Sequence, residues 1–111
     1  MSNVEPIDSN LKVADFSQII AQPQVVLIDI RTPQEFAEGF IDGAKNIDFY
    51  NDEFESEIEK LSKEFNYVLY CRSGHRSGLA LKLMQDEGFS SVCHLEGGIL
   101  EWVLQGKSII T

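Results

Sequence analysis

The sequence is organised around ten residues, Val68-Leu69-Tyr70-Cys71-Arg72-Ser73-Gly74-His75-Arg76-Ser77. The stretch opens with a short apolar run, which is typical of a buried strand. A small polar loop follows Cys71, and an amphipathic segment that predicts a helix begins at Ser77. A cysteine between a strand and a helix is a candidate nucleophile, because the free N–H groups at a helix start favour an anion.

Two features of this loop would stabilise a thiolate at Cys71, and the thiolate is the form of cysteine that attacks. Arg72 and Arg76 add positive charges on either side of the sulfur. Gly74 allows the loop to turn its N–H groups inward as a nest for an anion. The alternative is a structural cysteine at the end of a core strand, beside solvated arginines, because buried free cysteine is common.

Length, charge and cysteine content limit the possible functions. The 111 residues suit one domain, and 43% hydrophobic with 24% charged residues indicates neither disorder nor a fibrous repeat. A net charge of −9 argues against nucleic acid and anionic membranes as partners. The two cysteines form no CxxC pair, so we expect no disulfide framework and no zinc site. The sequence implies no other metal and no organic cofactor. With no leader pattern and no long apolar run, we expect a cytoplasmic protein.

Strand and helix patterns alternate along the chain, with no hairpin turn between strands. Strands are expected at residues 11–13, 25–30, 45–48, 67–70 and 91–95. Helices are expected at residues 15–21, 33–38, 53–64, 77–87 and from Gly97-Gly98 to 104. In the fourth of these helices the inward-facing residues are expected to be Leu79, Ala80, Leu83 and Met84. This order predicts an α/β fold whose parallel sheet has helices on both faces.

Charged residues follow the strand at residues 25–30, where open α/β sheets place their sites. Asp29 and Arg31 stand at its carboxyl end, and Thr32 to Glu35 has the pattern of a helix capping box. Asp29 and Glu35 are either plain surface carboxylates or groups that hold the loop arginines in place, and the pattern leaves both open.

The remaining candidates have less specific patterns. His75 lies in the loop, where it either tunes the cysteine or contacts substrate, or is an exposed histidine without a role. Cys93 is expected in the core and His94 half-exposed on the same strand, while Trp102 is expected to be a core aromatic residue.

Four pieces of the chain together resemble the rhodanese-like sulfurtransferases in their single-domain form. They are Ile28-Asp29-Ile30-Arg31 with Glu35-Phe36, the run from Gly39 to Ile47, the loop from Cys71 to Ser77, and Leu95-Glu96-Gly97-Gly98 with Trp102. The resemblance implies a five-stranded parallel sheet with Cys71 at the carboxyl end of the fourth strand. It divides the chain into a lead-in (1–9), a rhodanese domain (10–106) and a C-terminal tail (107–111).

The resemblance also implies a reaction. Cys71 would take a sulfane sulfur from thiosulfate or a related persulfide or polysulfide, and pass it to cyanide, a thiol or a sulfur-accepting protein. The backbone N–H groups of the loop residues Arg72, Ser73, Gly74, His75 and Arg76 would stabilise the thiolate and the terminal persulfide sulfur. The side chains of Arg72 and Arg76 would bind the small anionic donor and its leaving group. Asp29, Arg31, Glu35 and Ser77 would support the loop. The alternative is a sulfur-carrier or regulatory protein-binding module with little small-molecule turnover.

Loop length separates this interpretation from a phosphatase. Related phosphatases resemble a pattern with five residues between cysteine and arginine, whereas this chain has four between Cys71 and Arg76. The smaller loop suits a sulfur atom better than a phosphoryl group. The chain departs from the family pattern at Phe40, where histidine is usual, and at Asp48, where proline is common.

Overall fold

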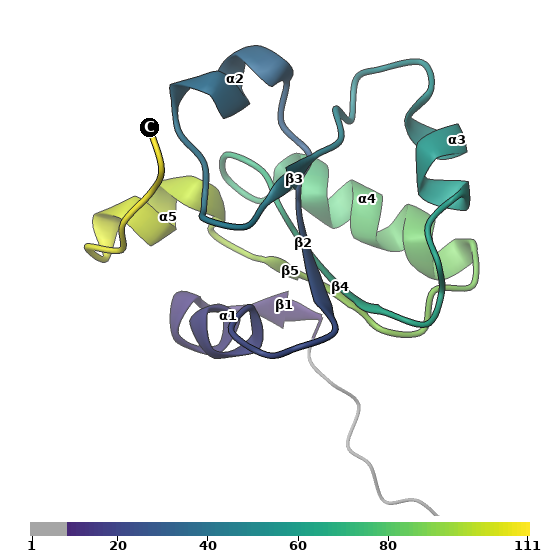
Figure 1. Ribbon diagram of the computed structural model, residues 1–111, viewed down its shortest axis with the longest axis horizontal. Coiled ribbons are helices and arrows are strands. Elements are labelled where there is room, and N and C mark those ends of the chain that lie inside the picture. Colours follow the sequence, from purple (N-terminus) through teal and green to yellow (C-terminus); the bar gives the residue numbers. More distant parts are fainter. Residues whose placement is uncertain (1–8) are drawn as a thin grey trace, which may run out of the picture.

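The computed structural model describes residues 9–111 (Figure 1). In this part of the chain, five strands form one parallel sheet in the order β1-β5-β4-β2-β3. The strands are β1 (Asn10–Leu11), β2 (Val25–Asp29), β3 (Lys45–Asn46), β4 (Asn66–Tyr70) and β5 (Val92–Leu95). The helices are α1 (Val13–Ile19), α2 (Pro33–Glu38), α3 (Phe54–Glu59), α4 (His75–Asp86) and α5 (Gly98–Leu104). The expected five-stranded parallel sheet is confirmed, whereas residues 1–8 of the predicted lead-in lie outside the described residues.

Strands β2 and β4 form the centre of the sheet. They pair along their whole length, from Val25 opposite Asn66 to Asp29 opposite Tyr70. Both are rich in apolar residues because a central parallel strand is buried on both faces. Their carboxyl ends therefore finish side by side, and Cys71 is the next residue after β4.

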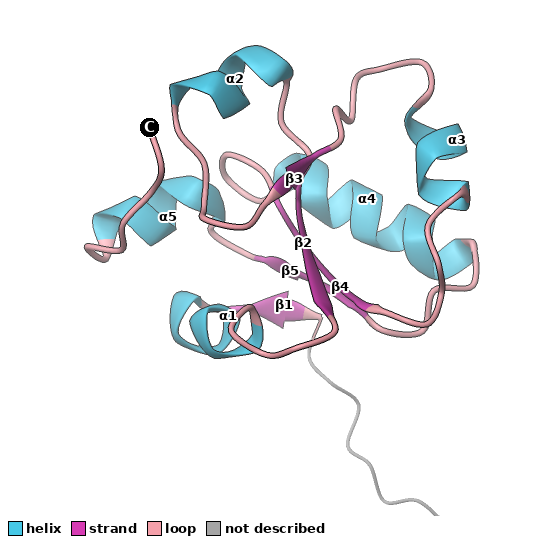
Figure 2. Ribbon diagram, in the orientation of Figure 1, coloured by secondary structure: helices cyan, strands magenta, loops and turns pink. Residues whose placement is uncertain are grey.

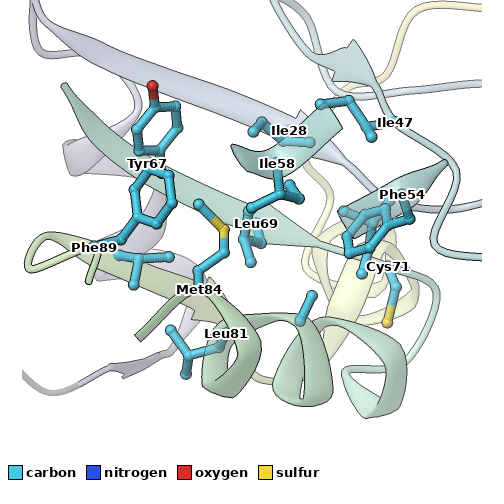
Figure 3. Packing of buried hydrophobic residues seen from close by; sticks show 13 residues of the cluster. Ile28, Ile47, Phe54, Ile58, Tyr67, Leu69, Cys71, Leu81, Met84 and Phe89 are labelled. Carbon is cyan, nitrogen blue, oxygen red and sulfur yellow. The ribbon is translucent and has the colours of Figure 1, made fainter. Parts of the chain in front are cut away.

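Helices cover both faces of the sheet (Figure 2). On one face, α3 and α4 pack against β2 and β4 in a cluster that includes Ile28, Ile58, Leu69, Met84 and Cys71 (Figure 3). On the other face, α1 and α5 pack in a second cluster that includes Phe16, Val68, Leu95 and Trp102. The rings of Phe16 and Trp102 meet edge to face at 5.6 Å, so the expectation that Trp102 is a core residue is confirmed.

Helix α4 differs from its prediction in start and orientation. It begins at His75 rather than Ser77, because Gly74 ends the loop in a left-handed conformation with φ of 101°. Its buried residues are Ser77, Ala80, Leu81 and Met84, at the i, i+3, i+4, i+7 spacing of a single face. The prediction that Leu79 faces inward is wrong, since that side chain is 50% exposed. The buried face thus includes one polar residue, Ser77.

Other element ends also shift. Helix α3 ends at Glu59, five residues earlier than expected, and α1 begins at Val13 in place of the predicted third strand residue. The predicted tail packs back on the domain: Phe40 and Ile110 exchange backbone hydrogen bonds of 2.9 and 2.7 Å, and Trp102 Nε1 donates to Ser108 O. Phe40 also stacks on Phe36 with ring centroids 4.3 Å apart.

Within residues 9–111, none of the helices has the length and apolar character needed to cross a membrane.

Candidate active site

Cys71 lies at the carboxyl edge of the sheet, directly after β4. Its side chain is buried, at the end of the α3/α4 cluster away from Tyr67 and Phe89 (Figure 3). Parallel α/β sheets place their sites at this edge, because loops that follow neighbouring strands meet there. The sulfur is thus held on a rigid strand end and covered by the loop that follows it.

Hydrogen-bond donors converge on the Cys71 sulfur from the start of α4. The backbone N–H groups of Gly74 and Ser77 donate to Sγ at 3.2 and 3.4 Å, and the thiol in turn donates to Ser77 Oγ at 3.5 Å. The donors to Sγ are therefore Gly74 and Ser77, not the whole run of amides from Arg72 to Arg76. A sulfur anion at this position would accept hydrogen bonds from fixed backbone dipoles.

Two glycines allow the loop to pack closely against the backbone at the start of α5. A Cβ at Gly74 would lie 2.0 Å from the Glu96 carbonyl oxygen, and a Cβ at Gly98 would lie 2.2 Å from the Arg72 carbonyl oxygen. The N–H groups of Ile99 and Leu100 donate to the carbonyls of Cys71 and Arg72, at 2.9 and 3.1 Å. Helix α5 therefore supports the loop from beneath. In the sequence Gly98 is recognisable only as part of the Leu95-Glu96-Gly97-Gly98 motif, although paired glycines before a helix indicate such a close approach.

The side chain of Arg76 joins the loop to α2. Its guanidinium binds the Glu35 carboxylate with two bonds, of 2.8 and 3.0 Å, and lies over the Tyr50 ring. These bonds, with further ones from Thr32, hold the pKa of Glu35 at about 2, well below its usual 4.5, despite partial burial that acts the other way. Glu35 also closes the capping box with Thr32. Of the two options for Glu35, contact with a loop arginine is the one observed.

Asp29 has a different partner. It is fully buried and binds Arg31 through two parallel hydrogen bonds, of 3.0 and 2.6 Å, and Arg31 continues to the Gly39 carbonyl. Burial opposes the charge of Arg31, but the bonds and charge of Asp29 outweigh it and raise the pKa of Arg31. The option that Asp29 holds a loop arginine is therefore wrong. The Asp29–Arg31 pair instead fixes the segment after α2, because the guanidinium that Asp29 orients donates to the Gly39 carbonyl oxygen.

Of the predictions for the two residues on β5, the one for Cys93 is confirmed and the one for His94 is wrong. Cys93 is buried as expected, and burial raises the pKa of its thiol to about 11. The expectation that His94 is half-exposed is wrong, because the side chain is 4% exposed and packs under α4. Its Nδ1 lies 2.7 Å from Ser77 Oγ. His94 thus reaches the site through Ser77, a contact that strand alternation in the sequence did not reveal.

The outer loop residues are open to solvent. Arg72, Ser73 and His75 are all exposed, and within the described residues no carboxylate forms an ion pair with Arg72. His75 lies in the first turn of α4. Among residues 9–111 no group of three histidine, cysteine or carboxylate side chains is arranged to hold a metal ion.

The ion pair of Glu35 leads to a first prediction. Glu35→Gln keeps an amide oxygen for the capping box but removes the charge, so we expect the free energy of unfolding at neutral pH to fall by about 1 to 2 kcal/mol. Because the pKa of Glu35 is lowered on folding, this stability is fully present above pH 4.5 and is lost as the pH falls toward 2. Urea unfolding of both proteins across this range measures it. A difference that stays constant down to the acid end would contradict the ion-pair origin.

Comparisons with known proteins agree with this geometry. The family model described as rhodanese-like domain matches residues 12–105. A sulfurtransferase of Allochromatium vinosum is 35% identical over 108 residues, which cover 96% of this chain and 95% of that protein. The solved structure of the human single-domain sulfurtransferase TSTD1 has a TM-score of 0.79 and 25% identity, covering 91% of this chain and 99% of that one. A tRNA uridine(34) hydroxylase of Acaryochloris marina is 33% identical over 89% of this chain, which spans only 33% of that protein's length.

Proposed function

This chain belongs to the rhodanese-like domain family, with single-domain sulfurtransferases among its relatives, and from that premise we propose that it transfers a sulfane sulfur through a persulfide on Cys71. The observation that carries the proposal is the convergence of the Gly74 and Ser77 N–H groups on Sγ. These dipoles would stabilise the thiolate before the reaction and the terminal persulfide sulfur after it.

The reaction has two halves, as in other double displacements. The Cys71 thiolate attacks the outer sulfur of the donor; a sulfur–sulfur bond forms, and the donor's own bond breaks with its electron pair leaving on the anion. With thiosulfate as donor this anion is sulfite. The acceptor, cyanide or a thiol, then attacks the outer sulfur of the persulfide, and the electron pair of the broken bond returns to Cys71 as thiolate. No metal or organic cofactor takes part in this scheme.

The two loop arginines take different roles in this proposal. Arg76 is held by Glu35, so it fixes the loop and contributes a positive charge from a set position. Arg72 is exposed at the loop surface and is the arginine that would meet an anionic donor such as thiosulfate. Because the catalytic thiol must stay reduced, the reaction suits a reducing compartment such as the cytoplasm.

A mass measurement tests the proposal. The protein is incubated with thiosulfate and its intact mass is measured before and after addition of cyanide. We expect the protein to gain one sulfur atom, located on Cys71 by peptide mapping, and to lose it to cyanide. If thiosulfate, polysulfide and glutathione persulfide all leave Cys71 unmodified, the proposed function is wrong.

A second candidate is a sulfur-carrier or regulatory module that serves one protein partner. The observation in its favour is that the matching region is only a third of the tRNA uridine(34) hydroxylase relative, so the same domain also exists as part of a longer protein. Such a module would form the persulfide but turn over slowly with cyanide and thiols. Steady-state thiocyanate formation measured beside persulfide formation separates the two candidates.

A further inference from the structure

A chain of hydrogen bonds runs from the Cys71 sulfur across the sheet to β1. Sγ lies 3.5 Å from Ser77 Oγ, Ser77 Oγ lies 2.7 Å from His94 Nδ1, and His94 Nε2 lies 2.7 Å from Asn10 Oδ1. Cys71, Ser77 and His94 are all buried, so water does not compete for the two bonds that join them. The chain joins α4, β5 and β1, which no local sequence pattern links.

Asn10, at the end of this series, determines which atom donates and which accepts in each bond. An amide oxygen such as Asn10 Oδ1 only accepts, so His94 carries its proton on Nε2 and leaves Nδ1 as an acceptor. The Ser77 hydroxyl has two acceptors in reach, Gly74 O at 3.3 Å and His94 Nδ1 at 2.7 Å, and the shorter distance favours the imidazole. The lone pairs of Ser77 Oγ then remain available to the thiol proton of Cys71.

The surroundings keep the imidazole neutral. Burial lowers the pKa of His94, and the negative charge of Glu96 on the same strand end acts in the opposite direction but is smaller. Glu96 is itself paired with Lys12, which follows β1, at 2.8 Å. On the α4 side the ring faces Gly78, which has no side chain, and Ser77, beyond which lies the Cys71 thiol.

We propose that His94 is a positioning residue that takes up the Cys71 thiol proton through Ser77, so that the thiolate forms before it attacks the sulfur donor. The proton of the thiol moves to Ser77 Oγ while the hydroxyl proton moves to His94 Nδ1, which leaves a thiolate and an imidazolium and consumes no other reagent. When the acceptor removes the outer sulfur, the proton returns along the same path. The inference rests on the proposed function, because it explains how a buried thiol becomes the nucleophile of that reaction.

Two variants, on different elements, interrupt this series of hydrogen bonds. His94→Asn keeps an oxygen near the position of Nδ1 but cannot take a proton, and Ser77→Ala removes the hydroxyl that links the two groups. We expect both to slow persulfide formation from thiosulfate about tenfold near neutral pH, with rates that approach the wild-type rate toward about pH 9, where hydroxide removes the thiol proton directly. Cys93→Ala, on the opposite face of β5, is the matched control and should keep the wild-type pH profile.

A second measurement needs no sulfur donor. The ultraviolet absorbance of the Cys71 thiolate, taken as the difference from Cys71→Ser, should rise at higher pH in His94→Asn and Ser77→Ala than in the wild type. Rates lowered equally at every pH, with unchanged thiolate absorbance, would overturn the relay and leave His94 a structural residue. A shifted absorbance in a protein that forms no persulfide would support the relay and overturn the proposed function instead. Melting curves verify that each variant is folded.

Discussion

Cys71→Ser is expected to abolish sulfur transfer, at least about a thousandfold, because a serine hydroxyl neither forms a persulfide nor ionises at neutral pH. Folding should change by less than about 1 kcal/mol, because the smaller oxygen still accepts from the Gly74 and Ser77 N–H groups that now face Sγ. Thiocyanate formation from thiosulfate and cyanide measures the first effect, and urea unfolding measures the second.

The same substitution at Cys93 provides the control. Cys93 is buried in the α1/α5 cluster and is the other free cysteine of the described residues. Cys93→Ser should keep sulfur transfer but lower the free energy of unfolding by about 1 to 3 kcal/mol, because a hydroxyl enters apolar surroundings. The two variants should thus show opposite patterns of activity and stability. Retained transfer in Cys71→Ser, or its loss in a folded Cys93→Ser, would contradict the assignment of the nucleophile.

Gly98→Ala is expected to cost about 2 to 4 kcal/mol of stability and to abolish sulfur transfer in whatever protein still folds. The added Cβ would lie 2.2 Å from the Arg72 carbonyl oxygen, and φ of 67° already disfavours a side chain. The backbone at Gly98 cannot shift alone to relieve this clash, because the N–H groups of Ile99 and Leu100 donate to carbonyls of the same loop. The Cys71 loop should therefore move as a unit away from its present contacts.

The loss expected for Gly98→Ala has two causes, the strain of a side chain at positive φ and the collision of the added Cβ. Gly106→Ala separates them. Gly106 has a similar φ of 82°, but nothing lies within 4 Å of the position of its Cβ. This variant should lose only about 1 kcal/mol and keep full activity, since it has the backbone strain without the collision. Urea unfolding and persulfide formation are measured for both variants. Equal losses in the two would mean that the contact between Gly98 and the loop is unimportant.

The sheet and the position of Cys71 were predictable because their signals are local. The apolar runs of β2 and β4, the capping box at Thr32 and the glycine-containing loop each specify nearby structure without help from the rest of the chain. The parallel order follows from the alternation of strands and helices. The resemblance to a known family added the prediction that the sheet has five strands and that the cysteine follows the fourth.

His94 and the face of α4 were not predictable for a common reason. Strand β5 is four residues long and buried on both faces, so polar and apolar residues carry no period that could tell inside from outside. In α4, the buried position is taken by Ser77, a polar residue whose partners Cys71 and His94 lie six and seventeen residues away. Burial of a polar group follows from its partners, which only the folded chain brings together.

The outermost strands, β1 and β3, contain two residues each. So short an edge offers too few unpaired N–H and C=O groups for another chain to extend the sheet. The short edge strands thereby protect the sheet against aggregation by edge-to-edge strand pairing. A protein that delivers or collects sulfur would consequently recognise side chains around the carboxyl end of β4 rather than join as an added strand. Selectivity among such proteins would then depend on exposed residues such as Arg72 and His75.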